Sequence, residues 1–204
     1  MKFRLLLTAI VLFTVSAFAQ EVKKEAAPDQ AMEAKSPGEN PEMAAWMAYM
    51  TPGDMHKMMA SAVGDWTQEV TMWMDPAAPP SKSVADCTVK MLFGDRYQES
   101  YTNGDMMGMP FEGKSTMAYD NIRKVFQSTW IDNMGTGLMY TEGPYDAKSN
   151  SITLTGTMVD PMSGKTEKVK EVMKFIDDNN QMMYMYILKD GKEIKTMEIK
   201  FTRK

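Results

Sequence analysis

The sequence predicts a mainly β protein, an antiparallel up-and-down β-barrel of about ten strands preceded by one or two short α-helices. Apolar and polar residues alternate from about position 66 onward, which is the period of strands with one solvent-facing side. Asn, Asp and Gly recur between the alternating segments, as tight turns require. A closed barrel is favoured because closure leaves no long edge strand exposed.

Ten segments carry this alternation. In the second segment Cys87 falls on the apolar side, which favours a small buried hydrophobe over a reactive thiol. Asp190-Gly191 is the sharpest hairpin signal, and Asn103-Gly104 is expected to form another turn. The predicted strands are 66–74, 85–93, 95–102, 114–119, 124–132, 138–145, 151–159, 167–176, 181–188 and 193–203.

The N-terminal 40 residues predict export. Lys2 and Arg4 precede a short apolar stretch that ends in Ala17-Phe-Ala19, the order found in a secretory signal peptide. A membrane anchor is the alternative, but a bilayer needs about 20 apolar residues. We expect a signal peptide at 1–19, a disordered linker at 20–40 and a single domain at 41–204. The protein would then be periplasmic or secreted, with no stable membrane anchor after cleavage.

Two short helices are expected before the first strand. Met43, Trp46, Met47 and Met50 form an apolar stripe at helical spacing. Thr51 can cap a second helix, with Pro52 at its first position and Asp54 near its positive end. This second helix would place Met55, Met58, Met59 and Ala62 on one face.

Charge argues against two classes of partner. Without Lys2 and Arg4 the chain has 21 basic and 27 acidic residues, a formal charge of −6 with its histidine neutral. Negative charge discourages binding to nucleic acid or anionic lipid. A single cysteine leaves no intramolecular disulfide, so the fold must depend on its apolar core. The oligomeric state stays open.

No catalytic motif is recognisable, and we expect a protein that is not an enzyme. His56 is the only imidazole, lies in a predicted helix and has no GxSxG sequence to accompany it. The glycine-rich segments lie between strands with no helix to follow, which favours turns over a phosphate site. Paired carboxylates could still support a hydrolase. The candidates are Glu99, Glu112, Asp120, Asp132 and Glu142.

Methionine is the compositional anomaly, with 24 residues. Thioethers can bind Cu(I), and clusters occur at 106–109 and at 182–185. The favoured interpretation is that Met replaces Leu in apolar packing. No cofactor is therefore predicted, with copper as one alternative and haem, bound through His56 or a thioether, as another.

A barrel of this size can hold one small ligand in its interior. We expect a small, largely apolar ligand, while a Met-rich copper-binding protein, a carboxylate-based hydrolase and a structural envelope protein remain as alternatives. Arg96 would need a carboxylate or an anionic ligand if it faced inward. The candidate ligand-binding residues are Trp66, Arg96, Tyr101, Phe111, Trp130, Asn133 and Tyr184.

Several short sequence blocks follow one another over about 50–204, and they begin at Thr51, Gly64, Met72, Gly94, Met106, Tyr119, Thr129, Asp160 and Thr196. In this order they resemble the bacterial domain-of-unknown-function family 1579. The resemblance implies a calycin-like barrel and an exported or cytosolic protein of unassigned activity, with no established catalytic set. The family's relation to fatty-acid-binding, lipocalin-like and haem-binding barrels favours ligand binding by analogy. Asp95 stands where a second glycine is expected.

Overall fold

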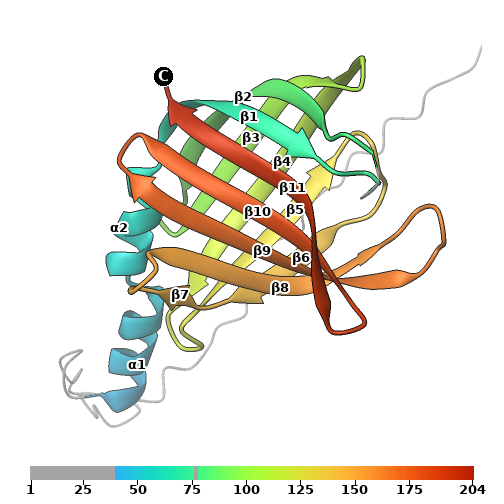
Figure 1. Ribbon diagram of the computed structural model, residues 1–204. Coiled ribbons are helices and arrows are strands. Elements are labelled where there is room, and N and C mark those ends of the chain that lie inside the picture. Colours follow the sequence, from blue (N-terminus) through green and yellow to red (C-terminus); the bar gives the residue numbers. More distant parts are fainter. Residues whose placement is uncertain (1–39, 76–77) are drawn as a thin grey trace, which may run out of the picture. The chain divides into compact units, whose positions relative to one another are not determined.

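The computed structural model describes residues 40–75 and 78–204. The predicted signal peptide at 1–19 and all but the last residue of the predicted linker lie outside the described residues. Two helices, α1 (Pro41–Met50) and α2 (Asp54–Ser61), precede eleven strands (Figure 1). The strands are β1 (Gly64–Met72), β2 (Ser81–Leu92), β3 (Tyr97–Met106), β4 (Met109–Asp120), β5 (Val125–Asp132), β6 (Met139–Gly143), β7 (Tyr145–Asp146), β8 (Ser151–Val159), β9 (Thr166–Asp177), β10 (Asn180–Lys189) and β11 (Lys192–Arg203).

The strands form one antiparallel sheet that closes on itself. Neighbours in sequence pair from β1 to β6 and from β8 to β11, while β1 pairs with β11 and β6 pairs with β8. The two-residue β7 pairs only with β8, so ten of the eleven strands make up the ring. The predicted ten-stranded up-and-down barrel is confirmed.

The pairing between β6 and β8 closes the ring, and it depends on glycine. A Cβ on Gly156 would lie 2.1 Å from the carbonyl oxygen of Tyr140, and one on Gly143 would lie 1.9 Å from that of Thr153. Neither distance is possible for real atoms, so only glycine lets the backbones approach this closely. Three residue pairs connect these two strands, which makes this the shortest junction in the ring.

The sequence identified one hairpin turn correctly and misplaced another. Asp190 and Gly191 have φ angles of 50° and 72°, as expected for a two-residue hairpin turn. Asn103-Gly104 is not a turn, because β3 continues to Met106 and turns at Met107-Gly108. A Cβ on Gly104 would lie 2.8 Å from that of Ala85, so this glycine serves a close approach between strands.

Both helices exist, but their ends and burial differ from the prediction. Gly53, and not Thr51, is the N-cap of α2, and its amide donates to Nδ1 of His56 at 3.1 Å. Thr51 ends α1, where its hydroxyl donates to the carbonyl of Met47. The apolar stripe of α1 is not buried, and Trp46 is 57% exposed. The helical spacing of the apolar residues predicted the helix correctly, but it did not predict that their face is exposed.

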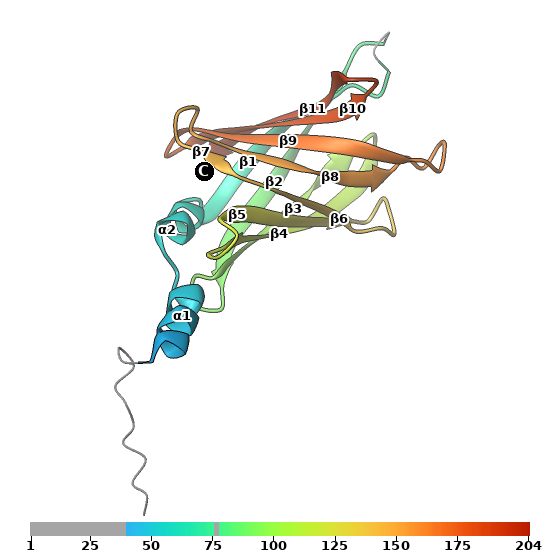
Figure 2. The same cartoon turned by 90° about the horizontal axis from the view of Figure 1, so that it is seen from below.

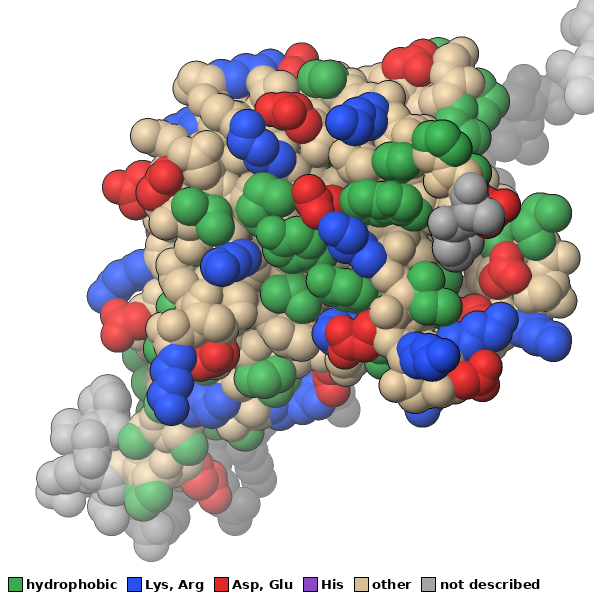
Figure 3. Space-filling view, viewed as in Figure 1, with side chains coloured by type: hydrophobic (Ala, Val, Ile, Leu, Met, Phe, Trp, Pro, Cys, Tyr) green, Lys and Arg blue, Asp and Glu red, His purple; other side chains and the backbone are tan. Residues whose placement is uncertain are grey.

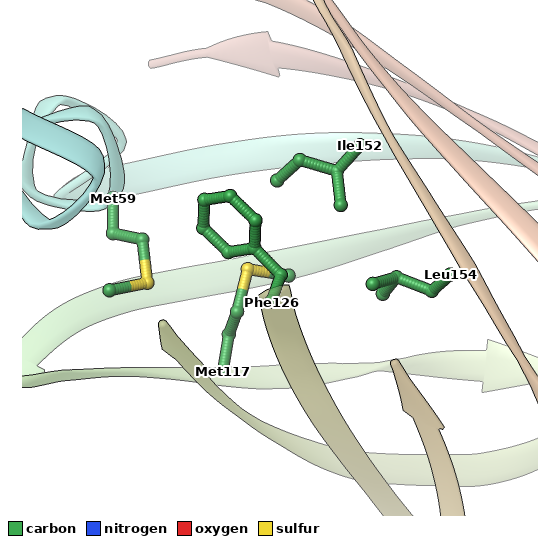
Figure 4. Packing of buried hydrophobic residues seen from close by; sticks show 5 residues of the cluster. All are labelled: Met59, Met117, Phe126, Ile152 and Leu154. Carbon is green, nitrogen blue, oxygen red and sulfur yellow. The ribbon is translucent and has the colours of Figure 1, made fainter. Parts of the chain in front are cut away.

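Helix α2 lies across one end of the barrel (Figure 2). Its Met59 belongs to a cluster with four inward-facing strand side chains (Figure 4), and all five side chains are at most 6% exposed. The Nε2 group of Gln98 on β3 donates to the carbonyl of Met59 at 2.7 Å, which fastens the helix to the barrel. We name Met59, Met117, Phe126, Ile152 and Leu154 the sealed cluster.

Trp66 and Arg203 complete this end of the barrel. The indole of Trp66 is 1% exposed and donates to the carbonyl of Ala62 at 2.9 Å. The guanidinium of Arg203 lies 4.3 Å from the centre of that ring. It also donates to the carbonyls of Ser61 and Val63, both at 2.7 Å. The last strand therefore holds the C-terminal end of α2 in place.

The barrel interior as candidate functional site

Four methionines on β9, β10 and β11 face the barrel interior. Met173 pairs with Met183, and Met185 pairs with Met197. Strand register places all four on the same face of the sheet as the buried Ile199. We name Met173, Met183, Met185 and Met197 the methionine wall. All four side chains are only partly buried. Because an inward side chain can be accessible only where its neighbours leave space, the interior beside this wall is incompletely filled.

Three serines face the interior from β3, β4 and β5. Ser100 pairs with Ser115, and the hydroxyls of Ser115 and Ser128 lie 3.4 Å apart. Each serine lies on the same face of its strand as a buried residue, as Ser100 does with Thr102. Hydroxyls can both donate and accept, so this side of the interior offers polar groups to a ligand.

Phe111 and Trp130 form an aromatic pair inside the barrel. Their rings are stacked with centroids 6.3 Å apart. Gly113 makes room for the indole, since a Cβ there would lie 2.4 Å from the Trp130 ring. Phe111 is buried and Trp130 is partly buried. Of the seven candidate ligand-binding residues, the structure brings these two into contact within the interior.

The segment that follows Trp130 fixes the orientation of its ring. The indole nitrogen donates to Oδ2 of Asp132 at 2.7 Å. The other oxygen of Asp132 accepts from the amides of Met134 and Gly135. Asn133 accepts from the amide of Glu112 and donates to the carbonyl of Pro110, so it joins β4 to this turn. Asn133 therefore has a structural role in an exposed turn.

Glu171 is the acidic side chain placed deepest among the inward residues. It pairs with Leu154 of the sealed cluster on one side and with Met185 of the methionine wall on the other. Its Oε2 accepts a hydrogen bond from Thr141 at 2.9 Å. Burial raises the pKa of Glu171, and the hydrogen bond from Thr141 partly opposes this shift.

Tyr101 and Tyr184 were expected to line the interior, but strand register places both on the outer face. Tyr101 pairs with Thr88 and Lys114 and is 40% exposed. Tyr184 pairs with Val172 and Glu198 among the apolar and charged side chains of the outer surface (Figure 3). The sequence identified the strands but assigned these two aromatics to the wrong face.

Trp66 and Arg96 also lie away from the accessible interior. Trp66 faces inward but is covered by α2 and Arg203, as described above. Arg96 lies in an exposed turn, where its guanidinium donates to the carbonyls of Phe93 and Gly94. It therefore needs neither a carboxylate partner nor an anionic ligand inside the barrel.

The segment 119–121 also has a structural role. Tyr119 packs against Phe126 with ring centroids 4.9 Å apart. Asp120 accepts from the amides of Ile122 and Arg123 within its own turn. The side-chain amide of Asn121 donates to the carbonyls of Tyr49 and Thr51 at 3.0 and 2.9 Å, so it caps the C-terminal end of α1.

The remaining carboxylates named as hydrolase candidates are paired on the outer surface. Glu99 forms ion pairs with Lys90 and Lys114, which lower its pKa. Glu142 accepts a bidentate pair from Arg123 and a hydrogen bond from Tyr140, and these contacts lower its pKa to about 2. Strand register places Glu99 and Glu142 on the outer face of the barrel.

Glu112 completes the set of outward carboxylates. It accepts a hydrogen bond from Tyr101, and the pKa of that phenol is raised by burial and by this contact. Its strand register places it opposite Asn103 on the outer side. The geometry therefore does not assemble a pair of carboxylates around a common substrate position.

His56 and Cys87 are both buried. His56 packs edge-on against Tyr119 at 5.9 Å, and burial followed by the charge of Arg96 lowers its pKa. Cys87 is 2% exposed, and burial raises the pKa of its thiol, as expected for a small hydrophobe. In residues 40–75 and 78–204, no group of three or more His, Cys, Asp or Glu side chains could hold a metal.

Within the described ranges, neither helix is long and apolar enough to cross a bilayer.

A closed antiparallel barrel with a partly accessible interior defines the class of protein, a calycin-like barrel. Residues 51–203 match the family described as protein of unknown function (DUF1579), and the chain belongs to this family. The crystal structure of Rv2717c from M. tuberculosis is similar in fold, with a TM-score of 0.55 and 11% sequence identity. The similarity covers 76% of this chain and 99% of that one. No curated protein matches the sequence.

Proposed function

We propose that this protein binds a small ligand with an apolar body inside its barrel and does not transform it. The observation that carries the proposal is the methionine wall, four inward-facing side chains that stay partly accessible while the sealed cluster is closed. Flexible thioethers adapt to ligands of irregular shape. Phe111 and Trp130 add an aromatic surface of the kind that lines small-molecule sites.

Two further features belong to this proposal. Export to the periplasm or the outside of the cell is supported by the charged, apolar and small-residue order of positions 1–19. A binding role without catalysis is supported by the engagement of the candidate carboxylates in turns and surface ion pairs. Held in this way, these groups are poorly placed to exchange protons with a substrate.

The proposal is tested with the neutral apolar probe N-phenyl-1-naphthylamine, whose fluorescence rises in apolar surroundings. We expect saturable binding to the purified protein. Trp130→Ala should weaken it about tenfold, equivalent to ~1.4 kcal/mol, because the stacked pair inside the barrel is lost. Binding is measured by fluorescence titration.

Tyr184→Ala is the matched control, since it removes an aromatic ring from the outer face of β10. It should leave the affinity for the probe unchanged. Circular dichroism and thermal melting would establish that both variants stay folded. Absence of saturable binding to the wild type, or equal losses in the two variants, would contradict an internal site.

A second candidate function, binding of Cu(I), is favoured by the same four methionines. Met173 with Met183 and Met185 with Met197 are directly paired, and opposed side chains in a sheet have Cβ atoms about 5 Å apart. Soft thioethers are suitable ligands for Cu(I). Anaerobic Cu(I) titration should then show one tight site that Met183→Leu and Met185→Leu together abolish. Binding weaker than micromolar would remove this candidate.

A further inference from the structure

We propose that the ligand is an amphiphilic amine, whose primary ammonium group contacts Glu171 while its apolar body lies along the methionine wall. This inference rests on the proposed binding function and specifies its ligand class.

Glu171 lies where the sealed cluster meets the methionine wall. Its strand neighbours across the sheet are Leu154, which is 1% exposed, and Met185, which is partly accessible. On the inward face of β9, Glu171 lies between Met173 and Val169, and Met173 is the one that pairs with Ile152 of the sealed cluster. A ligand resting on the methionine wall would therefore meet one acidic group with apolar side chains on both sides of it.

One oxygen of Glu171 is available to a ligand. Thr141 donates to Oε2, and Oε1 has no partner among the described residues. Within that same part of the chain, no buried side-chain oxygen or nitrogen lacks a hydrogen bond. Oε1 is therefore not completely buried, and it can accept a hydrogen bond without displacing Thr141.

Charged side chains of both signs occupy inward strand positions. Among the inward positions that the structure describes, the acidic residues include Asp132, Glu167 and Glu171, and the basic residues are Lys189, Lys192 and Arg203. Arg203 is held at the sealed end by backbone carbonyls and by the ring of Trp66. Lys189 and Lys192 lie exposed in the hairpin between β10 and β11, and neither is a strand neighbour of Glu171, so Glu171 has no adjacent basic residue among these positions. An ammonium group supplies that charge, whereas a fatty-acid carboxylate adds repulsion.

The inference is tested by competition between ligands that share one apolar chain and differ in head group. Dodecylammonium, dodecanol and dodecanoate are titrated at pH 7.5, below their micelle-forming concentrations, against protein with bound N-phenyl-1-naphthylamine. We expect dodecylammonium to displace the probe at a concentration at least about tenfold lower than dodecanol. Dodecanoate should be the weakest competitor.

Glu171→Gln keeps an acceptor for Thr141 and removes the charge. It should eliminate the advantage of dodecylammonium over dodecanol and leave the affinity for the neutral probe within about twofold. Glu69→Gln is the matched control, because Glu69 is a carboxylate on the outer face paired with Lys200. This control should keep the wild-type order of the three competitors.

The outcomes separate the two proposals. If the probe binds and the three head groups compete equally, or if Glu171→Gln keeps the advantage of the amine, the head-group inference is wrong while the binding function stands. If neither the probe nor dodecylammonium binds to the wild type, as checked by isothermal titration calorimetry, the binding function itself is wrong. Stronger competition by dodecanoate would also overturn the inference.

Discussion

The sealed cluster and the methionine wall are both made of inward-facing strand residues, yet they are packed differently. The sealed cluster combines a ring, branched aliphatic side chains and two methionines, one of them supplied by α2. Phe126 and Ile152 in this cluster are 0% exposed. The methionine wall packs against the sealed cluster through Met173, and its unbranched side chains stay partly accessible.

This difference shows that alternation alone does not produce a filled core. A barrel closes when its strands pair, but its interior is filled only where side chains of sufficient volume meet a covering element. Here α2, Trp66 and Arg203 cover one end. The remaining space is lined by thioethers, which are flexible enough to adapt to an incoming ligand.

The largest expected effect tests the packing difference directly. Phe126→Ala should lower the free energy of unfolding by about 3–5 kcal/mol, because it leaves a cavity in the sealed cluster. Met185→Ala should cost about 1 kcal/mol or less, because its side chain is already partly accessible. Both values are measured by urea unfolding followed by circular dichroism.

Met117→Ala provides a matched control for the chemistry of the side chain. Met117 belongs to the sealed cluster and is 6% exposed, so its loss should cost clearly more than that of Met185. Equal costs for the two methionine substitutions would show that the wall is packed as tightly as the cluster. The proposed site would then have no room for a ligand.

A smaller effect, on the order of 1 kcal/mol or less, concerns pH and has opposite signs in the two regions. The lowered pKa of His56 means that, as pH falls through 6.5, the unfolded chain binds a proton that the folded protein excludes, so stability decreases. The raised pKa of Glu171 means that, as pH falls towards 4.5, the folded protein binds a proton first, so stability increases.

Single substitutions separate the two contributions in urea unfolding measured from pH 7.5 to 4.5. His56→Gln keeps an acceptor for the amide of Gly53, since Gln is suited to this position of a capping box. It should remove the loss of stability below pH 6.5. Glu171→Gln should be more stable than wild type at pH 7.5, with a difference that shrinks towards pH 4.5. Unchanged pH profiles in both variants would contradict these assignments.

Part of the candidate site could be predicted from the sequence, but the assignment of aromatic residues to the interior contained one systematic error. Phe111 and Trp130 were identified and do meet inside the barrel. Tyr101 and Tyr184 were assigned to the interior, although both lie on the outer face of the sheet together with charged residues. Following the alternation strictly would have avoided this error, because Met183 and Met185 occupy the opposite phase to Tyr184.

Glu171 was missed for a related reason. It lies on the inward face of β9 with Val169 and Met173. An acidic residue at a position where apolar residues alternate is the feature of the sequence that indicates a polar group inside the barrel. Its hydrogen bond with Thr141 joins β9 to β6, which are not adjacent in the chain. Contacts of this kind depend on how the ring closes, and local patterns do not contain that information.

The sequence by itself determined the strands, most of their turns, the order of the meander and the membership in the family, because these depend on periodicity and on local backbone preferences. Only the tertiary structure decided which end of the barrel is covered, where β6 meets β8 and which inward side chains keep free space beside them. The physical reason is that covering and closure join residues far apart in sequence, and packing volume is a property of their assembly.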